Sequence, residues 1–262
     1  MKAFGICMQS LLAVRQQPSH RSEMTNQLLF GELMYVLDKL DSWFLIASAH
    51  DNYEGWVDLR QVALLPEEEF VALNQSPAAC LTSLHGRISC TGRPDIHLLL
   101  GSKLPWASEN KLVISGKTYT IDGEIGQPDE QLNAEQLVGD ARRFLGSPYL
   151  WGGRSLFGID CSGLVQVVFG LQGINLPRDS SMQVRLGHSV DFISEAMAGD
   201  LAFFDNQEEE IVHVGMMVDS RTVIHASGEV RIDGIDHYGI YNAQSQSYSH
   251  KIRIIKRLSC QL

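Results

Sequence analysis

Two different spacings of apolar and polar residues divide the chain near residue 130. Upstream, short apolar runs are separated by polar turns, which is typical of the strands of small β-barrels. The clearest runs lie at 28–30, 33–37, 43–47 and 52–57, and weaker ones lie at 111–114 and 117–122. We therefore predict a small β-barrel over residues 1–65 and a second, degenerate β-rich segment over residues 77–126.

Downstream of residue 130, the spacing is first helical and then β-like. Apolar residues recur at helical intervals from Leu137 to Leu145, and Asn133 is a candidate N-cap for this helix. A second helix is predicted to follow Asp160. Alternating apolar positions then predict strands at 201–204, 211–218 and 222–226. Helices followed by strands favour an α+β domain over residues 130–262.

Composition narrows the classes of function. Hydrophobic residues make up 44% of the 262 residues and charged residues 20%, so the chain can build a folded core. The formal charge of −10 disfavours binding to nucleic acid. No apolar run has the length of a membrane helix, no signal peptide is evident, and the cysteines form no CxxC pair. We expect a cytoplasmic enzyme with no membrane partner, no structural disulfide, no metal and no other cofactor.

Cys161 is the candidate nucleophile. It lies at the predicted start of a helix, in the polar sequence Asp160-Cys161-Ser162-Gly163. Unpaired N–H groups and the positive end of the helix dipole favour a thiolate at such a position, so we expect a lowered pKa. Most free cysteines are buried as small hydrophobic residues, and the polar neighbours argue against that alternative.

Two histidines are candidates for a base and its orienter. His213 lies in a predicted strand whose even positions, Val212 to Val218, are apolar and are expected to face the core, which leaves His213 on the other face. His225 would lie on the neighbouring strand, and either histidine could equally be a hydrogen-bonded core residue. With Cys161 they fit the nucleophile, base and orienter of a cysteine hydrolase. No role is assigned to the remaining histidines, which are His20, His50, His85, His97, His188, His237 and His250.

Five motifs in order resemble the NlpC-type family of papain-like cell-wall peptidases. They are Ser147 to Gly153, Gly158 to Val165, Leu176 to Gln183, Gly199 to Leu201, and the two strands around His213 and His225. Each motif is weak alone, but their order and spacing are specific. The resemblance covers roughly residues 130–258, and the first half of the chain resembles the bacterial SH3-like domains often fused to this family. Within the family, the chain is most similar to the γ-D-glutamyl-L-diamino-acid endopeptidases that recycle peptidoglycan peptides.

The resemblance implies a role for each matching residue of the second half. Cys161 would attack the γ-glutamyl carbonyl, His213 would take and return the proton, and His225 would hold the imidazole in the correct tautomer. The Cys161 backbone N–H, at a helix start, is a natural oxyanion donor. The implied substrate contacts are Tyr149, Asp160, Ser162, Asp179 and Ser180. Asp179 would pair with the α-ammonium of an N-terminal L-alanine, although it could also simply cap a helix.

The resemblance also implies two contacts from the SH3-like half. Glu23 and Tyr53 match positions where this branch closes a pocket around the substrate amine. An exposed loop glutamate and a tyrosine packed against Trp56 are the alternatives. The expected partner is therefore an L-Ala-γ-D-Glu-diamino-acid peptide with a free amine.

Three other functions stay open. A secreted wall-lytic endopeptidase would act on intact peptidoglycan, and an export signal or an exposed groove would favour it. A wall-binding module with a non-peptidase NlpC fold would have lost Cys161 or His213, and both residues are present. Acyl transfer on the same fold is the third, since a thioester can react with nucleophiles other than water.

Overall fold

The structure is a computed structural model that describes residues 3–76, 79–105, 107–128 and 132–258. The chain forms two compact units: unit 1 comprises residues 1–128 and 151–156, and unit 2 comprises residues 129–150 and 157–262. Strands throughout unit 1 and helices packed with strands in unit 2 confirm the predicted α+β class. Residues 77–78 of the predicted segment 77–126, and residues 130–131 and 259–262 of the predicted segment 130–262, lie outside the described residues. Cys260 is among them. The domain boundaries stay a prediction.

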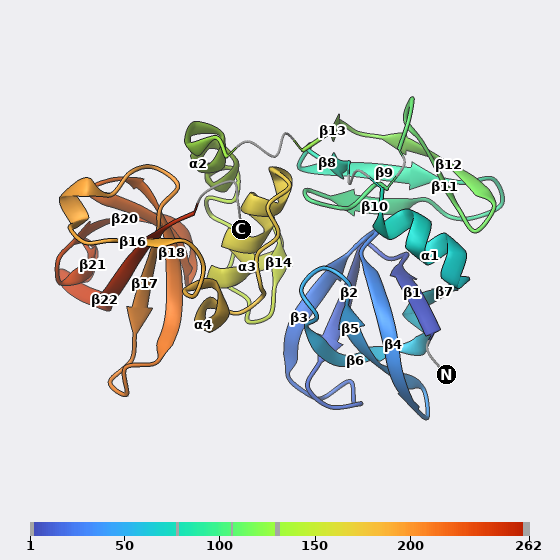
Figure 1. The fold of residues 1–262 in the computed structure, drawn as a ribbon, viewed down its shortest axis with the longest axis horizontal. Coiled ribbons are helices and arrows are strands. Elements are labelled where there is room, and N and C mark those ends of the chain that lie inside the picture. The colour runs from blue at the N-terminus through green and yellow to red at the C-terminus, as the bar shows by residue number, and fades with distance from the viewer. Residues whose placement is uncertain (1–2, 77–78, 106, 129–131, 259–262) are drawn as a thin grey trace. The chain divides into compact units, whose positions relative to one another are not determined.

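A seven-stranded antiparallel sheet forms the first part of unit 1, in the order β3-β2-β6-β5-β4-β1-β7 (Figure 1). Its strands are β1 (Ala3–Cys7), β2 (Leu11–Arg15), β3 (Met24–Leu29), β4 (Leu33–Leu40), β5 (Trp43–Ser48), β6 (Glu54–Asp58) and β7 (Val62–Leu65). Every second residue of β2 is buried, which places Leu12 and Val14 in the core, as a period of two requires. The predicted strands of this part are confirmed.

A smaller, four-stranded sheet follows in unit 1, in the order β10-β9-β12-β11. The remaining elements of unit 1, including the four strands of this sheet, are η1 (Leu59–Gln61), α1 (Glu67–Asn74), β8 (Cys80–Leu81), β9 (His85–Ser89), β10 (Ile96–Leu99), β11 (Lys111–Ile114), β12 (Lys117–Asp122), β13 (Ile125–Gly126) and β14 (Arg154–Ser155). Strands β11 and β12 match the two runs predicted there. One cluster of buried side chains, including Phe4, Phe30, Phe70, Leu81 and Ile121, joins both sheets and α1. The two β segments therefore share a hydrophobic core.

A buried ion pair holds residues 151–156 in unit 1. The Arg154 guanidinium donates to the Glu32 carboxylate at 2.8 and 2.9 Å, and the Arg154 backbone N–H donates to the Gln27 side chain at 2.9 Å. Burial raises the pKa of Glu32, but the charge and hydrogen bonds of Arg154 outweigh it and hold this pKa below its usual value. The sequence had suggested only a loop of the second half at this point.

Unit 2 is built on a β-barrel with helices packed against it. Its elements are α2 (Ala134–Arg142), β15 (Gly158–Ile159), α3 (Cys161–Leu171), α4 (Ser180–Gln183), β16 (His188–Val190), η2 (Ile193–Glu195), β17 (Leu201–Asp205), β18 (Ile211–Asp219), β19 (Thr222–Ser227), β20 (Glu229–Asp236), β21 (Gly239–Asn242) and β22 (Ser247–Arg257). Strands β17 to β21 pair in chain order, and β22 pairs with both β17 and β21, which closes the barrel. Helix α3 packs on β18 and β19 and is buried along its whole length.

Local sequence signals account for both long helices of unit 2. Asn133 caps α2 by accepting a hydrogen bond from the Gln136 backbone N–H at 3.1 Å, as predicted. Asp160 caps α3 in the same way, accepting from the Gly163 backbone N–H at 2.7 Å. Among the described residues, no helix combines the length and hydropathy that crossing a membrane requires.

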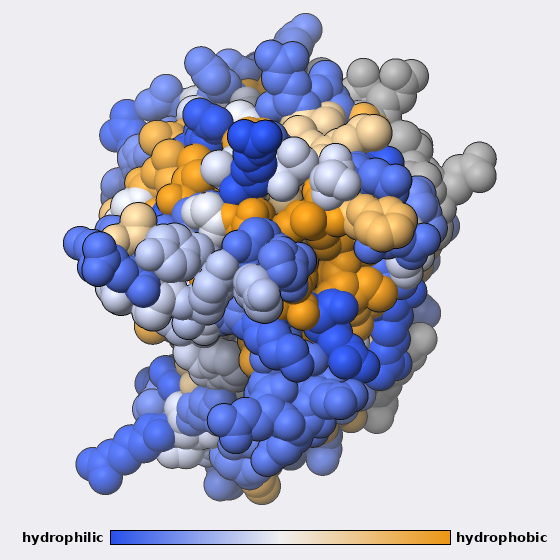
Figure 2. Space-filling model, turned by 90° about the vertical axis from the view of Figure 1, so that its left-hand side faces the viewer, coloured by the Kyte–Doolittle hydropathy of each residue, from blue (hydrophilic) through white to orange (hydrophobic). Residues whose placement is uncertain are grey.

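Figure 2 shows the barrel side of unit 2, where an apolar area lies among hydrophilic side chains. A groove of about 480 Å³ runs beside β16, η2 and the C-terminal part of β22, and Val190, Phe192 and Ile254 contribute to its lining. None of the candidate catalytic residues lines this groove among the residues described, so its apolar lining is separate from the chemistry considered below.

Candidate active site

Cys161 is the first residue of α3 and is 5% exposed. The predicted helix start is therefore confirmed. The backbone N–H groups of Ser162 and Val214 hydrogen bond to its Sγ atom. Because Val214 follows His213 in β18, the thiol lies against the strand that carries the candidate base.

The pKa of Cys161 differs from the expectation. Burial raises it to about 11, the negative charge of Asp160 adds to the increase, and the two backbone N–H groups only partly oppose them. The prediction of a lowered pKa was wrong because helix position alone does not reveal how completely the thiol leaves water. The Cys161 side chain is therefore a neutral thiol near pH 7, and a role as nucleophile would require a base that removes its proton.

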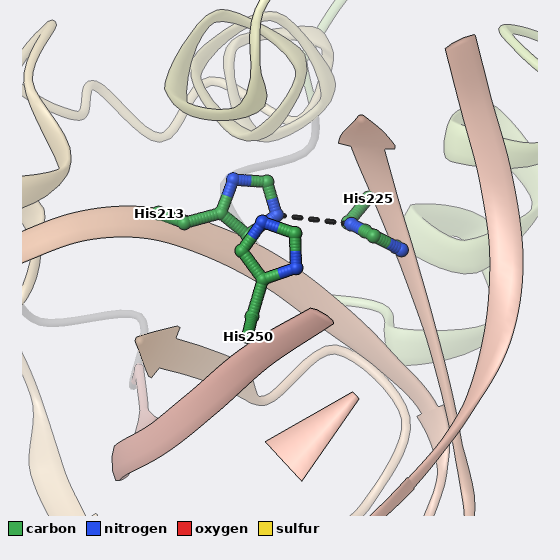
Figure 3. A group of neighbouring side chains, drawn as sticks. All are labelled: His213, His225 and His250. Carbon is green, nitrogen blue, oxygen red and sulfur yellow. Dashed lines mark hydrogen bonds between the residues drawn. The ribbon is translucent and has the colours of Figure 1, made fainter. Parts of the chain in front are cut away.

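A chain of hydrogen bonds runs from the candidate base into the barrel. The His213 Nε2 and His225 Nδ1 atoms lie 2.9 Å apart (Figure 3), and His225 Nε2 lies 3.1 Å from Asp233 Oδ2. Arg231 donates two hydrogen bonds to the same carboxylate, at 2.6 and 2.9 Å. His213, His225 and Asp233 come from neighbouring strands β18, β19 and β20 and are all buried.

This chain determines where the protons lie. Burial raises the pKa of Asp233, but Arg231 and His225 outweigh it, so Asp233 is a carboxylate that can only accept hydrogen bonds. His225 must then donate from Nε2, and burial lowers its pKa, so it is neutral and its Nδ1 accepts. His213 therefore donates from Nε2. Burial and the neighbouring histidines hold the pKa of His213 well below its usual range, so its Nδ1 keeps a lone pair.

The side of β18 that carries His213 also differs from the expectation. Val214 and Met216 are buried as predicted, whereas Val212 is 50% exposed. His213 and Met217 are buried as well, and Met217 belongs to the hydrophobic cluster inside the barrel. Both faces of β18 are therefore covered, one by α3 and the other by the barrel interior.

Three residues near the candidate base carried no recognisable sequence signal. Asp233 and Arg231 form the end of the hydrogen-bond chain that is farthest from His213. His250 of β22 stacks on His213 with ring centroids 4.1 Å apart, and burial lowers its pKa to about 4. The interpretation that gave His250 no role overlooked this contact, because the polar sequence around it does not suggest a strand at the barrel mouth.

The predicted substrate contacts near Cys161 also stabilise the local fold. Arg178 bridges Asp160 and Ser162, donating to both side chains from its two terminal nitrogens. Tyr149 lies close enough to Cys161 and Asp160 that, after burial, their charges add to the increase of its pKa to about 12. These four residues surround the start of α3.

The remaining candidates lie at α4 and in unit 1. Asp179 occupies the N-cap position of α4, is exposed and makes no side-chain capping hydrogen bond, while Ser180 begins the helix and is buried. In unit 1, Glu23 accepts a 2.6 Å hydrogen bond from the indole N–H of Trp151. Tyr53, directly before β6, is half-buried, and its backbone N–H donates to the Asp51 side chain at 3.1 Å. Their roles in binding stay predictions.

Comparison with known proteins agrees with this geometry. Residues 146–253 match the NlpC/P60 family, and residues 14–62 match the bacterial dipeptidyl-peptidase SH3 domain. The gamma-D-glutamyl-L-lysine dipeptidyl-peptidase of Bacillus subtilis (strain 168) is 32% identical over 221 residues, which cover 76% of this chain and 71% of that protein. The enzyme of the same name from Bacillus cereus (strain ATCC 10987 / NRS 248) is 28% identical over 238 residues, or 79% of this chain and 68% of that one.

A solved structure supports the fold. The crystal structure of an NlpC/P60 family protein from Bacillus cereus ATCC 10987 superposes with a TM-score of 0.83 at 22% identity, covering 99% of this chain and 100% of that one. Two matching domain families, relatives that match across most of the chain and a cysteine at the start of a helix packed on a strand with a buried histidine all agree. The chain belongs to the NlpC/P60 family of cysteine peptidases.

Proposed function

We propose that this peptidase hydrolyses the bond between γ-D-glutamate and the following diamino acid in small cell-wall peptides with a free N-terminal L-alanine. The names of the two Bacillus relatives support the γ-D-glutamyl bond as the point of cleavage. The observation that carries the chemistry is the buried chain from His213 through His225 to Asp233, which starts on the strand whose Val214 N–H hydrogen bonds to the Cys161 thiol.

The first half of the reaction forms a thioester. As Sγ of Cys161 attacks the γ-glutamyl carbonyl carbon, His213 Nδ1 takes the thiol proton, because the resting thiol is protonated and the resting imidazole is neutral. The carbonyl oxygen becomes an oxyanion that the Cys161 backbone N–H at the start of α3 would stabilise. Collapse breaks the C–N bond, and the imidazolium returns the proton to the leaving amine of the diamino acid.

The second half releases the dipeptide. Neutral His213 takes a proton from water as the water oxygen attacks the thioester carbon, and the proton returns to the departing sulfur. In both halves the imidazolium exists only transiently. The Asp233 carboxylate, acting through His225, stabilises that positive charge and keeps the lone pair of His213 on Nδ1.

Recognition of a free amine requires an anion, because an ammonium that leaves water without a partner loses its solvation. In unit 2, Asp179 is the candidate, because its side chain is exposed at the start of α4. In unit 1, the Glu23 carboxylate and the Tyr53 hydroxyl are candidates for additional hydrogen-bond acceptors. The role of Asp179 is tested by substitution.

The test compares kcat/KM for the tripeptide L-Ala-γ-D-Glu-L-Lys with that for its N-acetylated form and with release from intact sacculi. Acetylation removes the positive charge and should cost about 3–5 kcal/mol, or more than 100-fold. Asp179→Asn should lose most of this preference, and the exposed Asp191→Asn serves as the matched control. Comparable cleavage of all three substrates would contradict the proposal and favour a wall-lytic endopeptidase.

We further propose that the protein works in the cytoplasm, where small recycled peptides and reduced thiols occur together. The described cysteines Cys7, Cys90 and Cys161 are not in disulfides, which suits a reducing compartment. Cell fractionation with compartment markers tests this, and recovery with secreted proteins would overturn it.

A further inference from the structure

Three histidines converge at the mouth of the barrel in unit 2. The ring nitrogens of His213, His225 and His250 that could serve as ligands all lie within 4.8 Å of one another, and Figure 3 shows the three rings close together. They come from three strands, β18, β19 and β22. The Nδ1 atom of His250 lies 2.9 Å from the Ser249 hydroxyl, which leaves its Nε2 atom as the available ligand.

The chemistry of the three rings suits a transition metal. Burial lowers the pKa of each, so all three are neutral imidazoles near pH 7, the form that binds metals. The other nitrogen of His225 is held by Asp233, the carboxylate support that metal-binding histidines commonly have. An all-imidazole set suits zinc, copper and nickel and does not suit magnesium or calcium.

We propose that His213, His225 and His250 form a binding site for a divalent transition-metal ion, zinc in the first instance, and that the bound ion inhibits the peptidase. The inhibition rests on the proposed role of His213 as the base. The ion needs no contact with Cys161 to act.

The mechanism of inhibition follows from the proton positions. In the active state His213 carries its proton on Nε2 and offers its lone pair at Nδ1. A metal bound to Nε2 needs the lone pair there, so the proton of the neutral ring must move to Nδ1, with no net loss of charge or protons. The atom that should accept the thiol proton is then already protonated. His225 already has a lone pair on Nδ1 and keeps its Nε2 hydrogen bond to Asp233.

The geometry indicates a reversible inhibitor and not a structural ion. Zinc–imidazole bonds of 2.0–2.1 Å in a tetrahedral site place nitrogens about 3.3 Å apart. The His213 and His225 nitrogens are closer, at 2.9 Å, while the set extends to 4.8 Å. Binding must also turn His250 out of its stack on His213, whose planes now differ by 21°. These adjustments weaken binding relative to a preformed site.

Direct binding tests the site without peptidase activity. Titration of zinc chloride into Cys161→Ala, followed calorimetrically, excludes the thiol as a ligand. In the double variant Cys161→Ala/His250→Phe, an aromatic ring still stacks on His213 but the ligand nitrogen of residue 250 is gone. The affinity for zinc should therefore fall at least 10-fold relative to Cys161→Ala. The matched control is His97→Ala, because His85 and His97 form an exposed pair with the same 2.9 Å separation in unit 1. His97→Ala should abolish only weaker zinc binding at the exposed pair in unit 1. A larger loss of zinc affinity from His97→Ala than from His250→Phe would overturn the proposal.

A second measurement uses the unaltered protein. One equivalent of zinc should move the imidazole nitrogen resonances of His213, His225 and His250 in ¹⁵N NMR, and unchanged resonances would refute the site. Zinc should also inhibit tripeptide cleavage, reversibly with EDTA, at a concentration at least 10-fold lower in the unaltered protein than in His250→Phe, each compared with its own metal-free rate. His250-dependent zinc binding in a protein that does not cleave the tripeptide would support the metal site and overturn the proposed function. Cleavage of the tripeptide together with zinc binding that His250→Phe does not affect would support the proposed function and overturn the metal site.

Discussion

Replacement of Asp233 by asparagine perturbs the hydrogen-bond chain that begins at His213, while the side chain at position 233 keeps its size. In the structure one oxygen of Asp233 accepts from both His225 and Arg231, and the other accepts from Arg231 alone. An asparagine can offer an oxygen at only one of these positions. With its oxygen toward His225, its NH₂ group opposes an Arg231 N–H, and the negative charge is lost. With the NH₂ toward His225, the tautomers of both histidines must reverse.

The expected size of the effect follows from the bond that is weakened. A hydrogen bond to a charged group contributes about 1.5–3 kcal/mol, and the positive charge on His213 exists only in the transition state. Asp233→Asn should therefore lower kcat roughly 10- to 150-fold with little change in KM. Reversal of the tautomers would cost more, because His213 would then present N–H and not a lone pair to the thiol of Cys161.

Kinetics and NMR together distinguish these cases. The kcat and KM values of Asp233→Asn are compared with those of Asp236→Asn, a control on the same strand whose carboxylate instead accepts from Tyr248. Nitrogen chemical shifts report whether His213 carries its proton on Nε2 or on Nδ1. A kcat equal to that of the unaltered enzyme, or a resting His213 protonated on Nδ1 in the unaltered protein, would refute the reasoning about the chain.

Three further predictions follow from the same structure. His213→Ala should lower kcat roughly 10³-fold or more, and His225→Gln should retain more activity than His225→Ala because an amide oxygen can still accept from His213; equal rates for the two His225 variants would argue against an orienting role. Because the pKa of Cys161 is raised to about 11, its alkylation by iodoacetamide without substrate should accelerate with pH toward that value, whereas a rate already maximal at pH 7 would indicate a resting thiolate. Glu32→Gln leaves Arg154 buried without its anion and should lower the free energy of unfolding by about 3–5 kcal/mol in urea titrations, with partial recovery in the double variant Glu32→Gln/Arg154→Met. Because the pKa of Glu32 is lowered on folding, the ion pair's contribution to stability is complete above about pH 4.5 and is lost as the pH falls through the pKa of the folded state. A free energy of unfolding that does not change with pH in this range would contradict this prediction.

The elements that carry local signals could be predicted from the sequence. Asn133 and Asp160 each show a capping residue directly before a helical apolar pattern, and both cap helices. Strands β11 and β12 have alternating apolar residues and match the predicted runs within unit 1. The positions of Cys161, His213 and His225 also follow from spacing, because a helix start and two neighbouring strands are defined over short distances along the chain.

The features that escaped prediction depend on contacts between distant segments. Strand β20 buries Asp233 on the inner side of the barrel, which interrupts the apolar alternation by which strands are recognised. His250 lies in a polar part of β22, and only closure of the barrel brings it to His213. The Arg154–Glu32 ion pair joins residues 122 positions apart, and no local pattern marks a loop arginine for burial.

The nature of the bond cleaved is the central claim, and product analysis by mass spectrometry tests it most directly. The unaltered protein and Cys161→Ser, both checked for folding by circular dichroism, are incubated with L-Ala-γ-D-Glu-L-Lys and with its diaminopimelate counterpart. The account predicts that the unaltered protein releases the dipeptide L-Ala-γ-D-Glu and the free diamino acid, and that Cys161→Ser releases neither at a comparable rate. Cleavage between alanine and glutamate, or equal turnover by Cys161→Ser, would contradict it.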